Sequence, residues 1–298
     1  MINFRHTSYF FFALILLNSC AFNNSFLSPT VVDREAREQT LYIQEDTVLV
    51  QYHGEQYQPL FIRNGQDTVT FNHTIESVLF PSESGNELNG WLIIPNDIEI
   101  KGTILFFHGN AGDITGRHWN MNLLMQYGFQ VFAVDYSGYG LSTGKAKRKF
   151  IIQDGISALE YIKQRKEVEG TKFIIYGQSL GGNLAASVAG RKGELIDGLV
   201  VEGAFSSHKD IGRRFAGFLS DWFVKEMYSA KESVQHYHKP ILVIHSVMDF
   251  VVPLEHGKTI YDNANEPKEF YIINDCHTCG SRIYHKEIGE KLLEMIGE

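Results

Sequence analysis

Residues 173–181 read FIIYGQSLG, and this stretch decides the fold. Its first four residues, Phe173–Tyr176, are apolar and predict a strand buried on both faces of a sheet. That strand runs directly into Gly177–Gly181, which matches the pattern G-x-S-x-G with Ser179 at its centre. The mostly small residues 182–186 favour a helix packed tightly behind the turn. The stretch therefore predicts a strand, a sharp turn that exposes a serine hydroxyl, and a helix.

A second segment, Gly140–Gly144, matches the same pattern around Ser142. It follows a glycine-rich loop and precedes the charged run Lys145–Lys149, so the strand that the motif requires is missing. We therefore predict that Ser179 is the nucleophile and that Ser142 is not.

Outward from this stretch, apolar runs alternate with helical patterns over residues 103–296. The predicted strands are 103–107, 130–134, 172–176, 198–201, 241–245 and 268–273, and the predicted helices are 114–127, 148–165, 180–190 and 281–296. Such alternation predicts an α/β fold, with a mostly parallel sheet and helices on both faces. Runs at 75–80 and 89–95 predict an antiparallel N-terminal hairpin at the sheet edge. Residues 41–298 are expected to form one domain.

A long excursion separates the strands that end at Val201 and begin after Pro240. Five residues in it recur at helical spacing: Phe215, Phe218, Leu219, Trp222 and Phe223. One interpretation is a helix that faces the core. The other is a small helical lid over about 205–238, beside the predicted site.

A serine hydroxyl needs a base to accept its proton and a third group to orient that base. On this fold the acid and then the histidine are expected after the serine, each on a loop that follows a strand. His277 follows the strand 268–273, and Asp249 follows the strand 241–245. Asp275 competes with Asp249 but lies only two residues from His277. His285 falls inside the closing helix, so we predict a surface residue there.

The oxyanion that forms on attack needs two backbone N–H donors. One is expected from Leu180, which follows the nucleophile. The other is expected from Asn110, in the loop His108–Gly112 after the strand 103–107, with Ala111 as the alternative. We expect His108 to hold this loop by hydrogen bonding.

The motifs in this order resemble those of the α/β-hydrolase superfamily. The resemblance covers about residues 75–298, and within the superfamily it points to a subgroup with an HGNAG loop that includes membrane-associated hydrolases of lipids and thioesters. The matching features are His108–Gly112, Asp135–Gly140 with Ser142 and Gly144, Gly177–Gly181, Asp249 with Val252-Pro253, and Pro267-Lys268 before His277. Two positions depart from the family pattern: Ser137 stands where Arg is common, and His277 lies in the sequence DCHTC.

Three cysteines are too few for a disulfide framework, so their positions matter more than their number. Cys276 and Cys279 form a C-x-x-C around His277. A zinc site, a redox motif, a local disulfide and two free thiols are the alternatives, and a second C-x-x-C that would complete a zinc site is missing from the sequence.

Cys20 ends an N-terminal segment with Arg5 near its start and an apolar run at 9–17. The run is too short to span a bilayer and is typical of an export signal. Residues 17–20, LNSC, resemble a bacterial lipoprotein signal, which implies a signal over 1–19, a lipidated Cys20 and a tether over 20–40. The resemblance implies an exported lipoprotein attached to a membrane of the bacterial envelope.

The chain has 298 residues and a net charge of −8, with no basic block that would favour nucleic acid. We expect a serine hydrolase that cleaves a carboxylic ester or thioester of a small acyl or lipid-like substrate, without metal or organic cofactor. The alternatives are a peptidase or amidase on the same triad and a non-catalytic binding protein.

Overall fold

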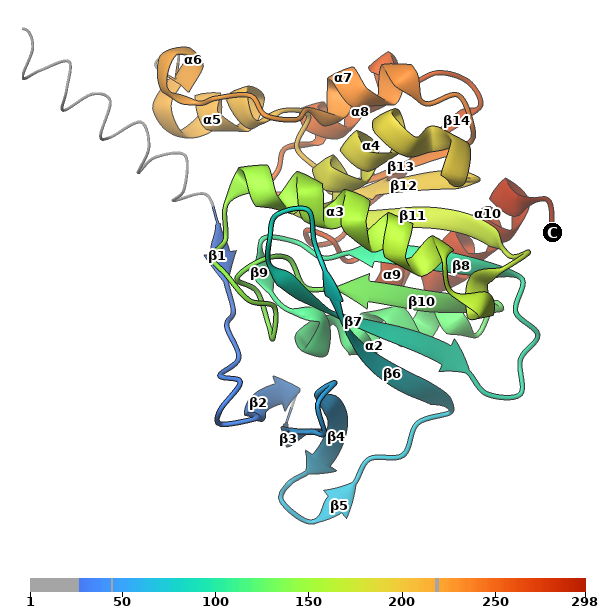
Figure 1. The fold of residues 1–298 in the computed structure, drawn as a ribbon. Helices are drawn as coiled ribbons and strands as arrows, with labels where there is room; N and C mark the ends of the chain where they lie inside the picture. The colour runs from blue at the N-terminus through green and yellow to red at the C-terminus, as the bar shows by residue number, and fades with distance from the viewer. Residues whose placement is uncertain (1–26, 44, 218–219) are drawn as a thin grey trace, which may run out of the picture.

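The computed structural model describes residues 27–43, 45–217 and 220–298. An eight-stranded sheet lies at its centre (Figure 1). In sheet order its strands are β14 (Lys268–Ile273), β13 (Ile241–Ser246), β12 (Gly198–Glu202), β11 (Lys172–Gln178), β8 (Gly102–Phe107), β10 (Phe129–Val134), β7 (Glu87–Pro95) and β6 (His73–Pro81). The strands from β14 to β10 run parallel, and β7 and β6 add an antiparallel hairpin.

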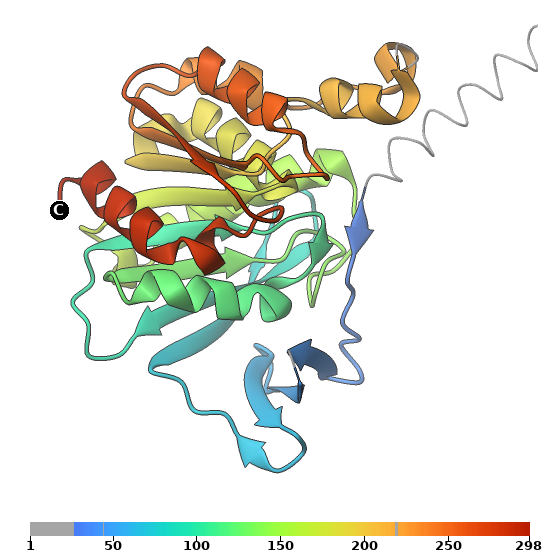
Figure 2. The same cartoon turned by 180° about the vertical axis from the view of Figure 1, so that it is seen from behind.

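Helices cover both faces of this sheet (Figures 1 and 2). Leu105 and Phe107 of β8 belong to a core on one face, and Ile104 and Phe106 belong to a core on the other. The first core includes α3 (Arg148–Lys163), α4 (Leu180–Lys192) and α8 (Leu254–Asn263), and the second includes α2 (Ile114–Met125) and α10 (His285–Ile296), which follows the short α9 (Gly280–Ile283). The predicted α/β fold is confirmed.

A second, antiparallel sheet precedes the hairpin. It consists of β2 (Glu38–Ile43), β3 (Asp46–His53), β4 (Gln58–Arg63) and β5 (Asp67–Thr68). Val48, Val50 and Phe61 on its inner face are buried in the same core as Trp91 of β7. The apolar and β-branched residues of 47–52 favour a strand and lie in β3, whereas β2 and β4 alternate weakly between polar and apolar residues and were not predicted.

Part of the segment predicted as a tether, residues 28–40, packs against the domain and contributes strands to it. β1 (Ser28–Pro29) pairs in parallel with β9 (Ala111–Gly112), and β2 begins at Glu38. Between them Val32 is buried, and its N–H donates to Gly140 O at 2.8 Å. The extended backbone has partners in two loops of the domain, which is why a stretch without sequence periodicity is ordered here.

Residues 1–26, with the predicted signal and Cys20, lie outside the described residues. Across the residues that the structure does describe, no helix combines the length and the apolar character needed to cross a membrane.

The excursion after β12 contains α5 (His208–Ala216), α6 (Ser220–Phe223) and α7 (Ala230–Ser233). In both views α5 and α6 extend away from the central sheet (Figures 1 and 2). Trp222 is 83% exposed, so the core-facing interpretation is wrong at this position. The side chains of Phe215, Phe218, Leu219 and Phe223 lie outside the described residues. The lid therefore stays a prediction.

A buried histidine pair lies where the two sheets meet. His73 of β6 and His118 of α2 place their Nε2 atoms 2.8 Å apart, and the ring of Phe61 from β4 stacks on His118. Burial lowers the pKa of His73 to about 4 and the pKa of His118 to about 3. Both imidazoles are therefore neutral in the folded protein near neutral pH.

This pair should make the protein sensitive to acid. Below about pH 6.5 the unfolded chain binds protons on these imidazoles and the folded chain does not, so the free energy of unfolding falls as the pH drops toward about 4. His118→Gln should reduce that pH dependence by about 1.4 kcal/mol per pH unit in this window. Urea unfolding at a series of pH values checks the slope, and an identical slope in wild type and variant would contradict the assignment.

Candidate active site

Ser179 lies at a strained turn between β11 and α4. Its backbone angles are φ 55° and ψ −114°, a region that non-glycine residues rarely adopt. Gly177 and Gly181 permit this turn: a Cβ at Gly177 would lie 2.0 Å from Gly181 O, and one at Gly181 would lie 2.1 Å from Phe107 O. The N–H of Ser179 donates to Glu202 O at 2.8 Å. The turn leaves the Ser179 side chain at the carboxyl edge of the sheet and only partly buried.

The predicted oxyanion loop lies against this turn. A Cβ added to Gly109 would lie 3.5 Å from the Cβ of Ser179. His108 is fully buried, donates from Nδ1 to Gly109 O at 2.7 Å, and places Nε2 3.5 Å from Asp135 Oδ1. His108 thus holds the loop, as expected. Leu180 is the first residue of α4, where N–H groups have no partner within the helix.

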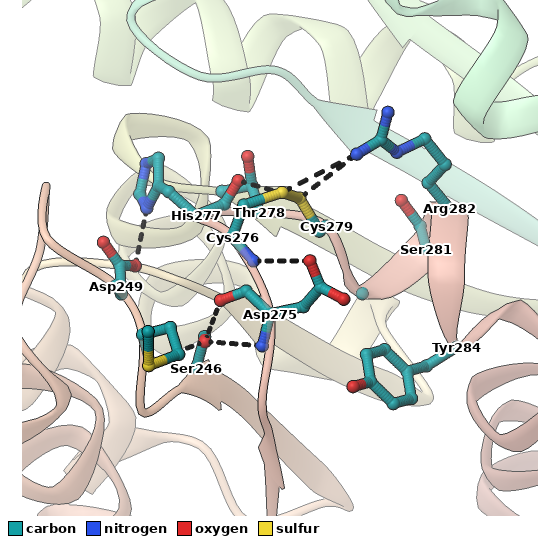
Figure 3. Close-up of a disulfide and its surroundings, with 12 residues drawn as sticks. Ser246, Asp249, Asp275, Cys276, His277, Thr278, Cys279, Ser281, Arg282 and Tyr284 are labelled. Carbon is teal, nitrogen blue, oxygen red and sulfur yellow. Dashed lines mark hydrogen bonds and ion pairs between the residues drawn. A yellow bond between two sulfur atoms is a disulfide. The ribbon is translucent and has the colours of Figure 1, made fainter.

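Asp249 and His277 come together from the loops after β13 and β14. His277 Nδ1 lies 2.6 Å from Asp249 Oδ2 (Figure 3). The other oxygen of Asp249 accepts the N–H groups of Val251 and Val252, at 2.9 and 2.8 Å. Burial acts to raise the pKa of Asp249, but the hydrogen bonds from His277 and Val252 outweigh it and leave the pKa below its usual value. Asp249 is therefore an anion that orients the imidazole.

The competing residues are engaged elsewhere. Asp275 Oδ1 accepts the N–H of Cys276 at 2.9 Å, and Asp249 is the carboxylate bonded to His277. His285 contacts Gln126 and Tyr127 at the surface, each at 3.2 Å. Ser142 is buried and donates to Asp135 O at 2.7 Å, which is a structural role.

Two polar residues that the sequence analysis missed hold the histidine loop. Ser246 hydrogen-bonds the backbone of Asp275, accepting its N–H at 3.1 Å and donating to its carbonyl (Figure 3). Glu202, buried at the end of β12, accepts the N–H of Gly280 at 2.6 Å and the side-chain amide of Gln178 at 2.8 Å. A charged residue at the end of the apolar run GLVVE was the available signal for Glu202.

The same end of β12 brings the serine and the histidine to one place. Ser179 N–H bonds Glu202, and a Cβ on the next residue, Gly203, would lie 3.3 Å from His277 Nδ1. The structure therefore gathers the predicted nucleophile, base, acid and oxyanion loop at one edge of the sheet.

Cys276 and Cys279 form a disulfide that flanks His277 (Figure 3). Arg282 Nη2 lies 3.6 and 3.5 Å from the two sulfurs. Asp275 and the two sulfurs lie close enough together to hold a metal ion, but sulfurs bonded to each other cannot act as thiolate ligands. Of the alternatives for this motif, the structure has the local disulfide.

The loop at Ser137 is held without the arginine that is common in the family. Asp154 of α3 is buried and accepts the N–H of Ser137 at 2.8 Å and the hydroxyl of Ser82 at 2.6 Å. Burial raises the pKa of Asp154, and these hydrogen bonds oppose the rise. The Ser137 backbone and the Ser82 hydroxyl thus hydrogen-bond Asp154 at the loop where Arg is common in the family.

Comparison with known proteins agrees with this arrangement. Residues 98–231 match the model of the family described as "Serine aminopeptidase, S33". The chain is 33% identical to the protein YfhR of Escherichia coli K12 over 210 residues, which are 67% of this chain and 72% of YfhR. It is 32% identical over 186 residues to the lysophosphatidylserine lipase ABHD12 of Danio rerio, covering 55% of this chain and 48% of the lipase.

Among solved structures, the esterase Pf2001 of Pyrococcus furiosus has the same fold. The TM-score is 0.62 at 20% identity, over 75% of this chain and 90% of the esterase. Taken with the turn at Ser179, these matches show that the chain belongs to the α/β-hydrolase family of hydrolases.

Proposed function

We propose that the protein is a serine hydrolase that cleaves a carboxylic ester or thioester with an apolar or lipid-like acyl group. The observation that carries the proposal is the 2.6 Å contact between His277 and Asp249 at the sheet edge where Ser179 stands at a strained turn. A buried carboxylate that orients an imidazole is what activation of a serine hydroxyl requires.

The reaction follows from these positions. Ser179 Oγ attacks the acyl carbon while His277 Nε2 accepts its proton, and the N–H groups of Asn110 and Leu180 stabilise the oxyanion. The imidazolium, paired with Asp249, returns the proton to the leaving alcohol or thiol, which leaves an acyl-enzyme on Ser179. Water activated by His277 then releases the acid.

Apolar side chains beside Asp249 support an apolar substrate. Four of the five residues in Val247–Val251 are exposed hydrophobics, between 47% and 75% exposed. Arg214 of α5 donates to Phe250 O at 2.7 Å, so the predicted lid contacts this loop. Exposed apolar side chains in one loop are typical of a surface that contacts a ligand or a partner. The relative ABHD12 is named a lysophosphatidylserine lipase, which is consistent with such a substrate.

An aminopeptidase is the second candidate, because the matched family is described as a serine aminopeptidase. The two candidates differ in the bond that they cleave. Parallel assays with p-nitrophenyl esters of increasing chain length and with aminoacyl p-nitroanilides separate them: we expect turnover of the esters, and a preference for the anilides would favour the peptidase.

Ser179→Ala should abolish covalent labelling by a fluorophosphonate and lower ester turnover by about 10⁴-fold or more, because the nucleophile is lost. Gel fluorescence and p-nitrophenyl ester kinetics measure both effects. Ser142→Ala is the matched control, since that serine lies in the second G-x-S-x-G segment, and it should still be labelled. Labelling that persists in Ser179→Ala would contradict the assignment.

Asp249→Asn should lower kcat by about 10⁴-fold, because the amide favours the wrong imidazole tautomer. Asp275→Asn is the control for the competing carboxylate, and its kcat should stay close to that of the wild type. Steady-state kinetics of the two variants measure kcat. A larger loss of kcat in Asp275→Asn than in Asp249→Asn would identify Asp275 as the carboxylate that orients His277.

We propose further that the protein is an exported lipoprotein of a bacterial envelope, lipidated at Cys20. Its support is the sequence LNSC at 17–20 after a short apolar run. β1 begins eight residues after Cys20, at Ser28, a span of at most about 28 Å at about 3.5 Å per residue. Since β1 pairs with the oxyanion loop, a lipid on Cys20 would keep the active site close to the membrane surface.

Cys20→Ser should therefore move the protein from the membrane fraction to the soluble fraction in a bacterial host, because no diacylglycerol can be attached. Fractionation with an antibody, together with metabolic labelling by an alkyne fatty acid, measures both effects. Cys276→Ser serves as the control for loss of a cysteine and should stay in the membrane fraction. Equal membrane association of the wild type and Cys20→Ser would count against lipidation.

A further inference from the structure

We propose that the N-terminal strap, defined as Ser28–Val32, is a positioning element that holds the oxyanion loop in its reactive geometry through the side chain of Asn110. This proposal rests on the proposed hydrolase function and adds to it a second segment of chain, far from the triad in sequence. The strap lies within residues 20–40, which the sequence predicted to be a tether.

The Asn110 side chain is fixed from two sides. Its Oδ1 accepts the backbone N–H of Ser28 at 3.0 Å and the hydroxyl of Tyr139 at 3.1 Å. These two bonds use both lone pairs of the carboxamide oxygen. The next two residues of the loop, Ala111 and Gly112, pair with Ser28 and Pro29 as parallel strands. The strap therefore hydrogen-bonds the side chain of Asn110 and pairs with the two residues that follow it in the loop.

The other end of the strap is fixed to a second loop of the site. Gly140 N–H donates to Thr30 O at 2.7 Å, and Val32 N–H donates to Gly140 O at 2.8 Å. Gly140 is closely packed, since a Cβ there would lie 1.9 Å from Asp135 Oδ2. The Val32 side chain is buried in the core with Trp91. The strap thus joins the oxyanion loop to the loop at Gly140 and to the buried core.

The oxyanion loop has few other restraints on its outer side. Ala111 is exposed and its carbonyl accepts a hydrogen bond from Arg117 Nη2 at 3.1 Å, and Gly112 has no side chain that could pack. Oxyanion stabilisation depends on donors that are in place before charge develops. Loosening the strap should therefore misplace the Asn110 N–H, which lowers kcat while KM changes little, because the interaction forms mainly in the transition state.

Ser28→Pro in the full-length protein removes the N–H that Asn110 accepts. Losing an oxyanion donor entirely costs about 10²–10³ in kcat, so we expect a misplaced donor to cost about 10–100-fold, with KM little changed. Asn110→Ala keeps its own backbone N–H but removes the acceptor, and a loss of similar size is expected. Ser28→Ala retains the backbone N–H and is the conservative variant, expected to restore the turnover that the proline loses.

The double variant Ser28→Pro/Asn110→Ala separates positioning from general damage. If the strap acts through Asn110 Oδ1, the double variant should lose no more kcat than the worse single variant. Independent losses that multiply would overturn the proposal, as would a Ser28→Pro protein with wild-type kcat. Thermal unfolding of each variant identifies a fold defect. A wild-type protein that is not labelled by the fluorophosphonate and turns over no ester would instead refute the hydrolase function, and with it the positioning role of the strap.

Discussion

The close backbone approach at the turn of Ser179 is the constraint on which the rest of the site depends. Only hydrogen fits at Gly177 and Gly181, because a Cβ at either position would collide with a carbonyl oxygen. Those two glycines let β11 run into α4 with Ser179 at φ 55°, a conformation that costs ~1–3 kcal/mol. Burial of β11 and α4 in the core offsets that cost. The hydroxyl consequently stands at a sheet edge above a helix N-terminus.

Parallel strand order converts this single turn into a site. Because β8, β11, β13 and β14 all end at the same edge, residues from four distant segments meet there. Hydrogen bonds then hold the loops at fixed positions: Ser246 and Glu202 hold the histidine loop, and the strap holds the oxyanion loop. Ser246 and Glu202 are thus positioning residues, and the proposed chemistry falls to Ser179, His277 and Asp249.

The sequence predicted those parts of the fold in which a local pattern determines the structure. Apolar runs between glycine turns located the parallel strands, and G-x-S-x-G located Ser179. Local patterns cannot predict contacts between distant segments. β1 is ordered by its pairing with a loop more than 80 residues away in sequence. Likewise, the hydrogen bond from Gly280 to Glu202 exists only because β12 lies beside the histidine loop. Asp275 lies nearer to His277 along the chain, but Asp249 is the carboxylate that contacts the imidazole. Only the folded arrangement of the two loops shows this contact. The interpretation as a core-facing helix is wrong at Trp222, which is exposed. Helical spacing indicates that residues share one face of a helix, but not whether that face packs against the core.

We propose that catalysis proceeds through an acyl-enzyme on Ser179. The most direct measurement is intact-protein mass spectrometry of the wild type, acid-quenched within milliseconds of mixing with a p-nitrophenyl ester, followed by peptide mapping. We expect a mass increase equal to one acyl group minus one hydrogen, located on Ser179 and formed at the rate of the initial p-nitrophenol burst. Steady ester turnover without any adduct, or an adduct on another residue, would contradict it.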